Sequence, residues 1–277
     1  MGFGLAGSAH AGETARLTAD VSSLDFGQIE PAGAALIPPA RVNILISSDA
    51  AFQVAIGTSP DALASGRLPP ARLAWRVPGD RFRDLTPMVP TPIAFGAPAA
   101  GSSRLAFDLE PRVGWDTPPG RYVSRLQFFV NGVVAADSVK VTFSVPARVD
   151  LVVGGQPFDS PSINPAQPDS YTYLRRSAVI TSNVAWKLSA WIEGRPRKSD
   201  SATTLTSSEF RIASPPGPPV SLSPGVRAVV ARGEPTANGP RSVALEVWID
   251  VKGSEAAGKY RTRLHFSADP DSADLLK

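Results

Sequence analysis

The chain has 277 residues, enough for two ordinary domains, and its 43% of hydrophobic residues argues against a disordered chain. Charged residues are few, at 19%, the net charge is +3, and the basic residues are scattered instead of following one groove, so no nucleic-acid partner is expected. Cysteine is absent, which excludes disulfides, thiolate catalysis and cysteine-ligated zinc.

The first residues, MGFGLAGSAHAGETA, are small and apolar, and Ala9-His10-Ala11 has the form of a signal-peptidase site. We therefore expect residues 1–13 to be the remnant of a secretory signal peptide, although no Lys or Arg precedes the short apolar stretch. A plain flexible N-terminus is the alternative. No stretch reaches the ~20 apolar residues that cross a bilayer. The sequence thus predicts a secreted, periplasmic or cell-surface protein without a membrane span.

Apolar and polar residues alternate along most of the chain, which is the period of a half-buried β-strand. The alternating stretches run over residues 52–56, 105–109, 122–130, 180–192, 243–251 and 260–266. No stretch of ten residues has the helical period, and 28 Pro with 23 Gly indicate many turns between short elements. Asn131-Gly132 is the strongest hairpin signal, because both residue types tolerate positive φ. These patterns predict an all-β protein built of β-sandwiches.

Two segments of the chain are repeated. ISSDAAFQVAI at residues 46–56 matches ITSNVAWKLSA at 180–190, and GRYVSRLQF at 120–128 matches GKYRTRLHF at 258–266. Copies of this length are too long for solenoid repeats, so they predict two domains of one fold that arose by internal duplication. We place domain 1 at residues 14–146, domain 2 at 147–268 and a polar tail at 269–277.

The repeat also assigns matching roles to single residues. Phe52 and Trp186 fall on the inward phase of the repeated strand and are expected in the core. Asp49 and Asn183 precede that strand, where we expect each to hold the turn through bonds from its side chain to the backbone. A shared functional role for these two residues is the alternative.

The segments PPGRYVSRLQF and AAGKYRTRLHF resemble the penultimate strand of immunoglobulin-like domains, in which a glycine turn precedes a tyrosine. The resemblance implies that Tyr122 and Tyr260 are corner tyrosines whose hydroxyls bond back to the corner. The cysteine pair of antibody domains is absent. More broadly, the chain is similar to bacterial secreted tandem sandwich proteins, the group that includes pilus subunits and surface adhesins. This similarity implies two tandem immunoglobulin-like β-sandwiches.

The two copies differ at their C-terminal ends. Copy one continues into a further strand, VVAADSVKVTFSV, whereas copy two ends in RLHFSADPDSADLLK with no matching strand. A sandwich without that strand exposes unpaired backbone groups and part of its core. The open place could be closed by residues 138–153, by the tail Ala273–Lys277, or by a strand from another molecule, as in pilin polymerisation. A six-stranded sandwich that closes on itself is the alternative.

Copy two also carries tryptophans on the outward phase of its strands, at Trp191 and Trp248. An outward tryptophan can stack on a sugar ring or anchor a protein partner, unless another domain or a loop covers it. Together with Arg261, Arg263 and His265 of the edge strand, these two residues form the candidate binding surface.

Residues for catalysis are scarce. The chain has two histidines, His10 and His265, and no cysteine, so serine–histidine systems and histidine metal sites are not expected. The segment DPDSAD lacks the glycine and the distal glutamate of a calcium loop. We therefore expect no enzymatic activity, no metal site and no cofactor.

The sequence predicts a non-enzymatic secreted or cell-surface structural or adhesive protein that acts through protein contacts, including self-assembly by strand addition. Its expected partners are other proteins, other copies of the chain, and glycans. The first alternative is a carbohydrate-binding module, which requires Trp191 and Trp248 on one exposed face. The second is a periplasmic pilus chaperone, which requires a basic pair between two immunoglobulin-like domains and an exposed edge strand such as SVKVTFSV.

Overall fold

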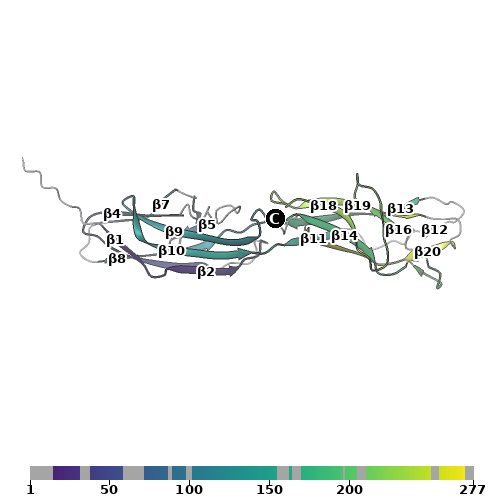
Figure 1. The fold of residues 1–277 in the computed structure, drawn as a ribbon, viewed down its shortest axis with the longest axis horizontal. Helices are drawn as coiled ribbons and strands as arrows, with labels where there is room; N and C mark the ends of the chain where they lie inside the picture. The colour runs from purple at the N-terminus through teal and green to yellow at the C-terminus, as the bar shows by residue number, and fades with distance from the viewer. Residues whose placement is uncertain are drawn as a thin grey trace, which may run out of the picture. The chain divides into compact units, whose positions relative to one another are not determined.

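The structure is a computed structural model of the chain (Figure 1). It describes residues 15–31, 38–58, 72–86, 89–97, 102–154, 162–163, 170–195, 197–204, 210–250 and 256–271. Every regular element in these residues is a β-strand, so the all-β prediction is confirmed, and none of them forms a helix that could span a membrane. The expected signal remnant at 1–13 lies outside the described residues.

The chain divides into two compact units. Unit 1 comprises Met1–Ile29, Ala34–Val113 and Gly120–Val145, and unit 2 comprises Glu30–Gly33, Gly114–Pro119 and Pro146–Lys277. Each unit packs the inner faces of its sheets around its own hydrophobic core. The predicted fold class, immunoglobulin-like β-sandwich, is confirmed. The origin of the two units by duplication stays a prediction.

Unit 1 contains two five-stranded sheets. Sheet I consists, in spatial order, of β1 (Arg16–Ala19), β3 (Ala40–Ser47), β8 (Ser102–Pro111), β5 (Leu73–Arg76) and β6 (Arg83–Asp84). Sheet II consists of β2 (Ser23–Gln28), β10 (Val133–Val145), β9 (Gly120–Val130), β4 (Phe52–Thr58) and β7 (Thr91–Gly96). Neighbouring strands are antiparallel, except that β2 runs parallel to β10.

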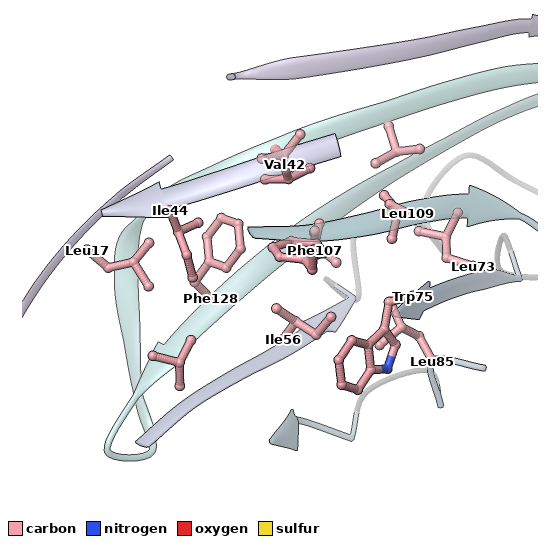
Figure 2. Packing of buried hydrophobic residues seen from close by; sticks show 14 of the residues in the cluster. Leu17, Val42, Ile44, Ile56, Leu73, Trp75, Leu85, Phe107, Leu109 and Phe128 are labelled. Carbon is pink, nitrogen blue, oxygen red and sulfur yellow. The ribbon is translucent and has the colours of Figure 1, made fainter. Parts of the chain in front are cut away.

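The core of unit 1 lies between these two sheets (Figure 2). Phe107 of sheet I and Phe128 of sheet II are fully buried and meet edge to face, with ring centroids 6.3 Å apart. Trp75 of β5 is also a core residue, at 3% exposure. Burial of each such side chain stabilises the fold by about 1.5–3 kcal/mol.

Unit 2 contains two larger sheets and one short three-stranded sheet. Sheet III consists of β11 (Val149–Gly154), β13 (Ser170–Ser182), β19 (Arg241–Asp250), β16 (Phe210–Ala213) and β17 (Val220–Ser221). Sheet IV consists of β18 (Ala228–Gly233), β14 (Trp186–Ile192) and β21 (Leu264–Pro270). The short sheet consists of β12 (Ser162–Ile163), β20 (Gly258–Arg261) and β15 (Arg197–Lys198). Because β21 continues to Pro270, the strand passes the expected domain boundary at residue 268.

Residues that match in the sequence repeat also pair in the same register in the two units. The matching pairs are Ile44 with Leu105 and Val54 with Val130 in unit 1, and Ala178 with Val243 and Leu188 with Ala268 in unit 2. A slip of one residue would turn every side chain of a strand to the opposite face, so agreement of register in two sheets supports the predicted duplication.

A row of charges crosses the outer face of sheet I. The carboxylate of Asp108 accepts a hydrogen bond from Nε of Arg41 and one from Nε of Arg76, each at 3.0 Å. Burial raises the pKa of Asp108, but these bonds outweigh it, and the pKa lies below its usual value. In unit 2 the matching residues Arg175 and Glu246 form an ion pair at 3.2 Å.

The turn before the repeated strand is held by serine, not by the expected Asp49 and Asn183. The hydroxyl of Ser48 donates to the carbonyl of Ala50 at 2.9 Å, and the hydroxyl of Ser182 donates to the carbonyl of Val184 at 2.7 Å. A hydroxyl both donates and accepts, so it can also receive the amide two residues on, as it does in both turns. The prediction was wrong for Asp49, whose exposed side chain makes no bond within its turn in the described residues. The Asn183 carboxamide does bond the backbone, but outside its own turn.

An aromatic ring lies over a glycine of the neighbouring edge strand in both units. Phe52 pairs with Gly96, and Trp186 pairs with Gly233. A side chain added at either glycine would overlap the ring. Both rings are buried, at 7% and 1% exposure, and Nε1 of Trp186 donates to the carbonyl of Glu234 at 3.0 Å.

We expect Gly233→Ala to lower the free energy of unfolding by about 1–3 kcal/mol, because the new methyl group must displace the Trp186 ring from a packed core. Gly194→Ala is the control, since nothing lies within 4 Å of a side chain added there. Urea denaturation followed by tryptophan fluorescence measures both variants. Equal stability of the two would contradict this packing.

Candidate functional site

In unit 1, strand β9 is covered on both sides. It pairs with β10 on one side and with β4 on the other. Its inward residues Leu126, Phe128 and Val130 are consequently at most 6% exposed. Strand β10 completes this part of the core, and the ring of its Phe143 stacks on Tyr122, with centroids 4.9 Å apart and planes at 6°.

In unit 2, the matching strand β21 has a partner on one side. Among the described residues, Leu264–Pro270 pairs with β14 and with no other strand. The residues that match Leu126, Phe128 and Val130 are Leu264, Phe266 and Ala268. All three contact the core but remain half-buried. The difference between the units is therefore the cover that β10 provides in unit 1.

Strand β11 lies next to β21 on its open side. It is an edge strand of sheet III that pairs with β13. Val149 and Leu151 pack against the core and are half-buried, whereas Val152 is 64% exposed and Val153 39%. β11 thus shields part of the apolar surface without forming a ladder with β21 in the described residues. We call this surface, formed by β11 and β21, the acceptor edge.

Strand β20, which precedes the acceptor edge, is already paired on the same side. Ser162 and Ile163 of β12 pair with Lys259 and Gly258, just before β21. In unit 1 the last residues of β10, Ser144 and Val145, pair with the residues that match Lys259 and Gly258. β12 therefore occupies the place of the C-terminal end of β10, and no other strand of the described residues occupies the rest of it. The tail Ala273–Lys277, which was considered as a cover, lies outside the described residues.

The corner expected from the sequence is present at Tyr260. This residue is fully buried, and its hydroxyl donates to the carbonyl of Ala256 at 2.8 Å. The bond spans four residues and fixes the start of β20, which leads into the acceptor edge. The hairpin residues Asn131 and Gly132 have φ of 50° and 81°, and Asn131 Oδ1 accepts the amide of Gln53 at 2.8 Å.

The two candidate tryptophans do not share a face. Trp191 lies on β14 of sheet IV, and Trp248 lies on β19 of sheet III. Each points away from the core, because Ile192 and Val247 beside them are buried. The outer faces of two packed sheets are opposite, so a platform of both rings for one sugar chain is not formed.

Of the remaining candidate residues, His265 contacts Trp191 directly. The Trp191 ring stacks on His265, with centroids 5.3 Å apart and planes at 14°, and the Arg227 guanidinium lies 4.8 Å from the same ring. Arg263 is exposed and lies 3.7 Å from the Glu193 carboxylate. Side chains of unit 2 therefore occupy part of the surface that Trp191 offers to a partner.

The candidate Arg261 and two acidic residues of the rejected calcium segment DPDSAD lie elsewhere in unit 2. Arg261 is exposed on β20 and pairs with Arg197 of β15, away from Trp191 along the strand. The carboxylates of Asp269 and Asp271 are engaged by Arg227 and Arg232. Within the described residues, no group of acidic or histidine side chains is placed to hold a metal ion.

Sequence reasoning missed the role of Asn183. This residue is 3% exposed, and its Nδ2 donates to the carbonyls of Pro146 at 3.0 Å and Thr117 at 3.2 Å. Its Oδ1 accepts the amide of Arg148 at 2.8 Å. All three contacts are with residues of unit 2 that are distant in sequence, so local spacing could not reveal them.

No model of a protein family and no curated protein matches the chain. Among solved structures, it is similar to the chaperone–tip adhesion subunit pre-assembly complex of the archaic chaperone-usher Csu pili of Acinetobacter baumannii, with 11% identity, a TM-score of 0.39, and coverage of 91% of this chain and 100% of that chain. It is also similar to the CupB6 tip adhesin from Pseudomonas aeruginosa, with 10% identity, a TM-score of 0.33, and coverage of 83% and 86%. Likenesses this distant carry no argument about function.

Proposed function

We propose that the chain is a non-enzymatic secreted or cell-surface protein that binds other proteins by accepting a β-strand along β21. The observation that carries this proposal is the contrast between two matching strands. Leu126 and Phe128 are fully buried beside β10, whereas Leu264 and Phe266 are half-buried at a strand edge that no strand of the described residues pairs with. An edge of this kind pairs readily with an added strand.

The chemistry of the incoming strand follows from β10. In unit 1, Val139 lies opposite Leu126, which matches Leu264 of β21. Val141 and Phe143 lie opposite Ser124 and Tyr122, which match Thr262 and Tyr260 just before β21. Alternate residues of β10 thus enter the core while the intervening ones face outward. The partner strand should therefore be antiparallel to β21 and to the residues just before it, and apolar at every second residue. Main-chain hydrogen bonds would supply affinity, and the apolar residues would supply register.

The chaperone alternative requires an exposed edge at SVKVTFSV, and the structure does not provide it. These residues lie within β10, between β9 and β2 in sheet II. Lys140–Thr142 and Ser144 pair with β2, so the backbone on that side is already bonded. In the described part of unit 1, this strand is internal.

A synthetic peptide with the sequence of residues 133–145 tests the proposal. We expect it to bind the full chain and to raise the unfolding temperature of unit 2, since a ligand present at 100 times its Kd stabilises by about 2.7 kcal/mol. The matched control is a peptide of the same composition in which the apolar residues no longer alternate. Calorimetry and hydrogen exchange of the β21 amides measure binding and locate it.

The variant Phe266→Asp should abolish binding of the peptide, because a carboxylate in the acceptor edge would lose its water when the strand is added. Arg263→Ala, with an exposed side chain outside β21, should bind as the unchanged chain does. Failure of the peptide to bind, or equal binding of the control peptide, would refute strand acceptance.

A further inference from the structure

A second surface, in unit 1, differs from the acceptor edge in having no charge. None of the residues 51–60, 85–103 and 126–136 is charged, in a chain with 19% charged residues. These three stretches contain β4, β7 and the hairpin end of β9 and β10. The four strands are neighbours in sheet II, so their uncharged residues share one end of its outer face.

Large apolar side chains lie open on this end of the sheet. Phe95 is the most exposed, at 76%, and Val134 is 53% exposed. Phe95 pairs with Gln53, and Val134 pairs with Phe129, so all four lie on the outward phase, opposite to the buried core residues. We call this surface, formed around Phe95, Phe129 and Val134, the neutral face.

Carboxamides accompany these apolar groups. Gln53 and Gln127 lie on the same outward phase of β4 and β9. The other end of the same outer face is different, because Arg121, Arg125 and Lys140 are exposed there. The absence of charge is therefore confined to the hairpin end of sheet II.

We infer that the neutral face binds the same face of a second copy of this chain. Exposed aromatic groups with few charges are typical of the centre of a protein interface. In a two-fold contact each patch meets its own copy, so any charge within it would be brought toward a like charge. A face without charges avoids that repulsion. Carboxamides both donate and accept, so they can pair with their own copies at the rim.

The experiment is sedimentation of the full chain over about 1–500 μM, a range that detects weak dimers. The β10 peptide is present in excess throughout, so that strand addition at β21 does not contribute to association. We expect a dimer whose Kd does not rise with salt, since no ion pairs hold it together. Phe95→Asp should weaken association at least about tenfold, as loss of a central aromatic residue does.

Leu45→Asp is the matched control, because Leu45 is 43% exposed on the outer face of the other sheet of the same unit. It should leave the dimer unchanged, and Val134→Asp should act as Phe95→Asp does. Circular dichroism verifies that each variant is folded. A monomer at every concentration, or equal effects of Phe95→Asp and Leu45→Asp, would overturn the inference, as would a dimer that neither Phe95→Asp nor Val134→Asp weakens. Strand acceptance is judged separately, by binding of the peptide.

Discussion

Phe128→Ala should lower the free energy of unfolding by about 3–5 kcal/mol, the usual range for a large side chain removed from a closed core. Phe128 is fully buried and contacts Phe107 across the two sheets. The matching change in unit 2, Phe266→Ala, should cost about 1–2 kcal/mol, because part of that ring is already in contact with water. Urea denaturation of the full chain measures the loss of stability in both variants. Hydrogen exchange of the β9 and β21 amides assigns each loss to its unit.

The same comparison reports on the acceptor edge. When the β10 peptide is bound, Phe266 should be enclosed as Phe128 is, and the cost of Phe266→Ala should approach that of Phe128→Ala. If the two variants lose equal stability without any peptide, Phe266 is already covered in solution, and β21 is not open to a further strand.

Asn183→Ala should lower the free energy of unfolding by about 2–4 kcal/mol, because three backbone groups, one buried and two partly buried, lose a hydrogen bond. The amide of Arg148 and the carbonyl of Pro146 lose their bonds to this side chain. Asp49 matches Asn183 in the repeat but is exposed, so Asp49→Ala should change stability by no more than about 0.5 kcal/mol.

Thermal unfolding of the two variants, each compared with the unchanged chain, measures this difference. A similar loss at Asp49 would mean that the two positions share one role, as the repeat alone suggested. A negligible loss at Asn183 would mean that water replaces its three bonds.

Alternation in the sequence predicted the faces of single strands well. It placed Trp186 in the core and Trp191 on the outside, and both lie where the period of two puts them. Side-chain direction depends on neighbouring residues of one strand, so local pattern is sufficient. The fold class followed from the same pattern, together with the frequent turns.

The sequence could not predict which strands share a sheet. The carbohydrate-binding alternative required Trp191 and Trp248 on one face, but the strands that carry them belong to different sheets. In the same way, the sequence of β10 is compatible with an edge strand. The structure shows that it pairs in parallel with β2, more than 100 positions away. These contacts depend on long-range topology, for which one sequence holds no local signal.

The aromatic–glycine pairs have a consequence for the outermost strands of sheets II and IV. A glycine offers no side chain to keep solvent from the adjacent peptide groups, so an edge strand would tend to fray there. The rings of Phe52 and Trp186 cover Gly96 and Gly233 and exclude water from the backbone at these glycines. In each of the edge strands β7 and β18, an aromatic side chain of the neighbouring strand thus shields the backbone at the glycine from water.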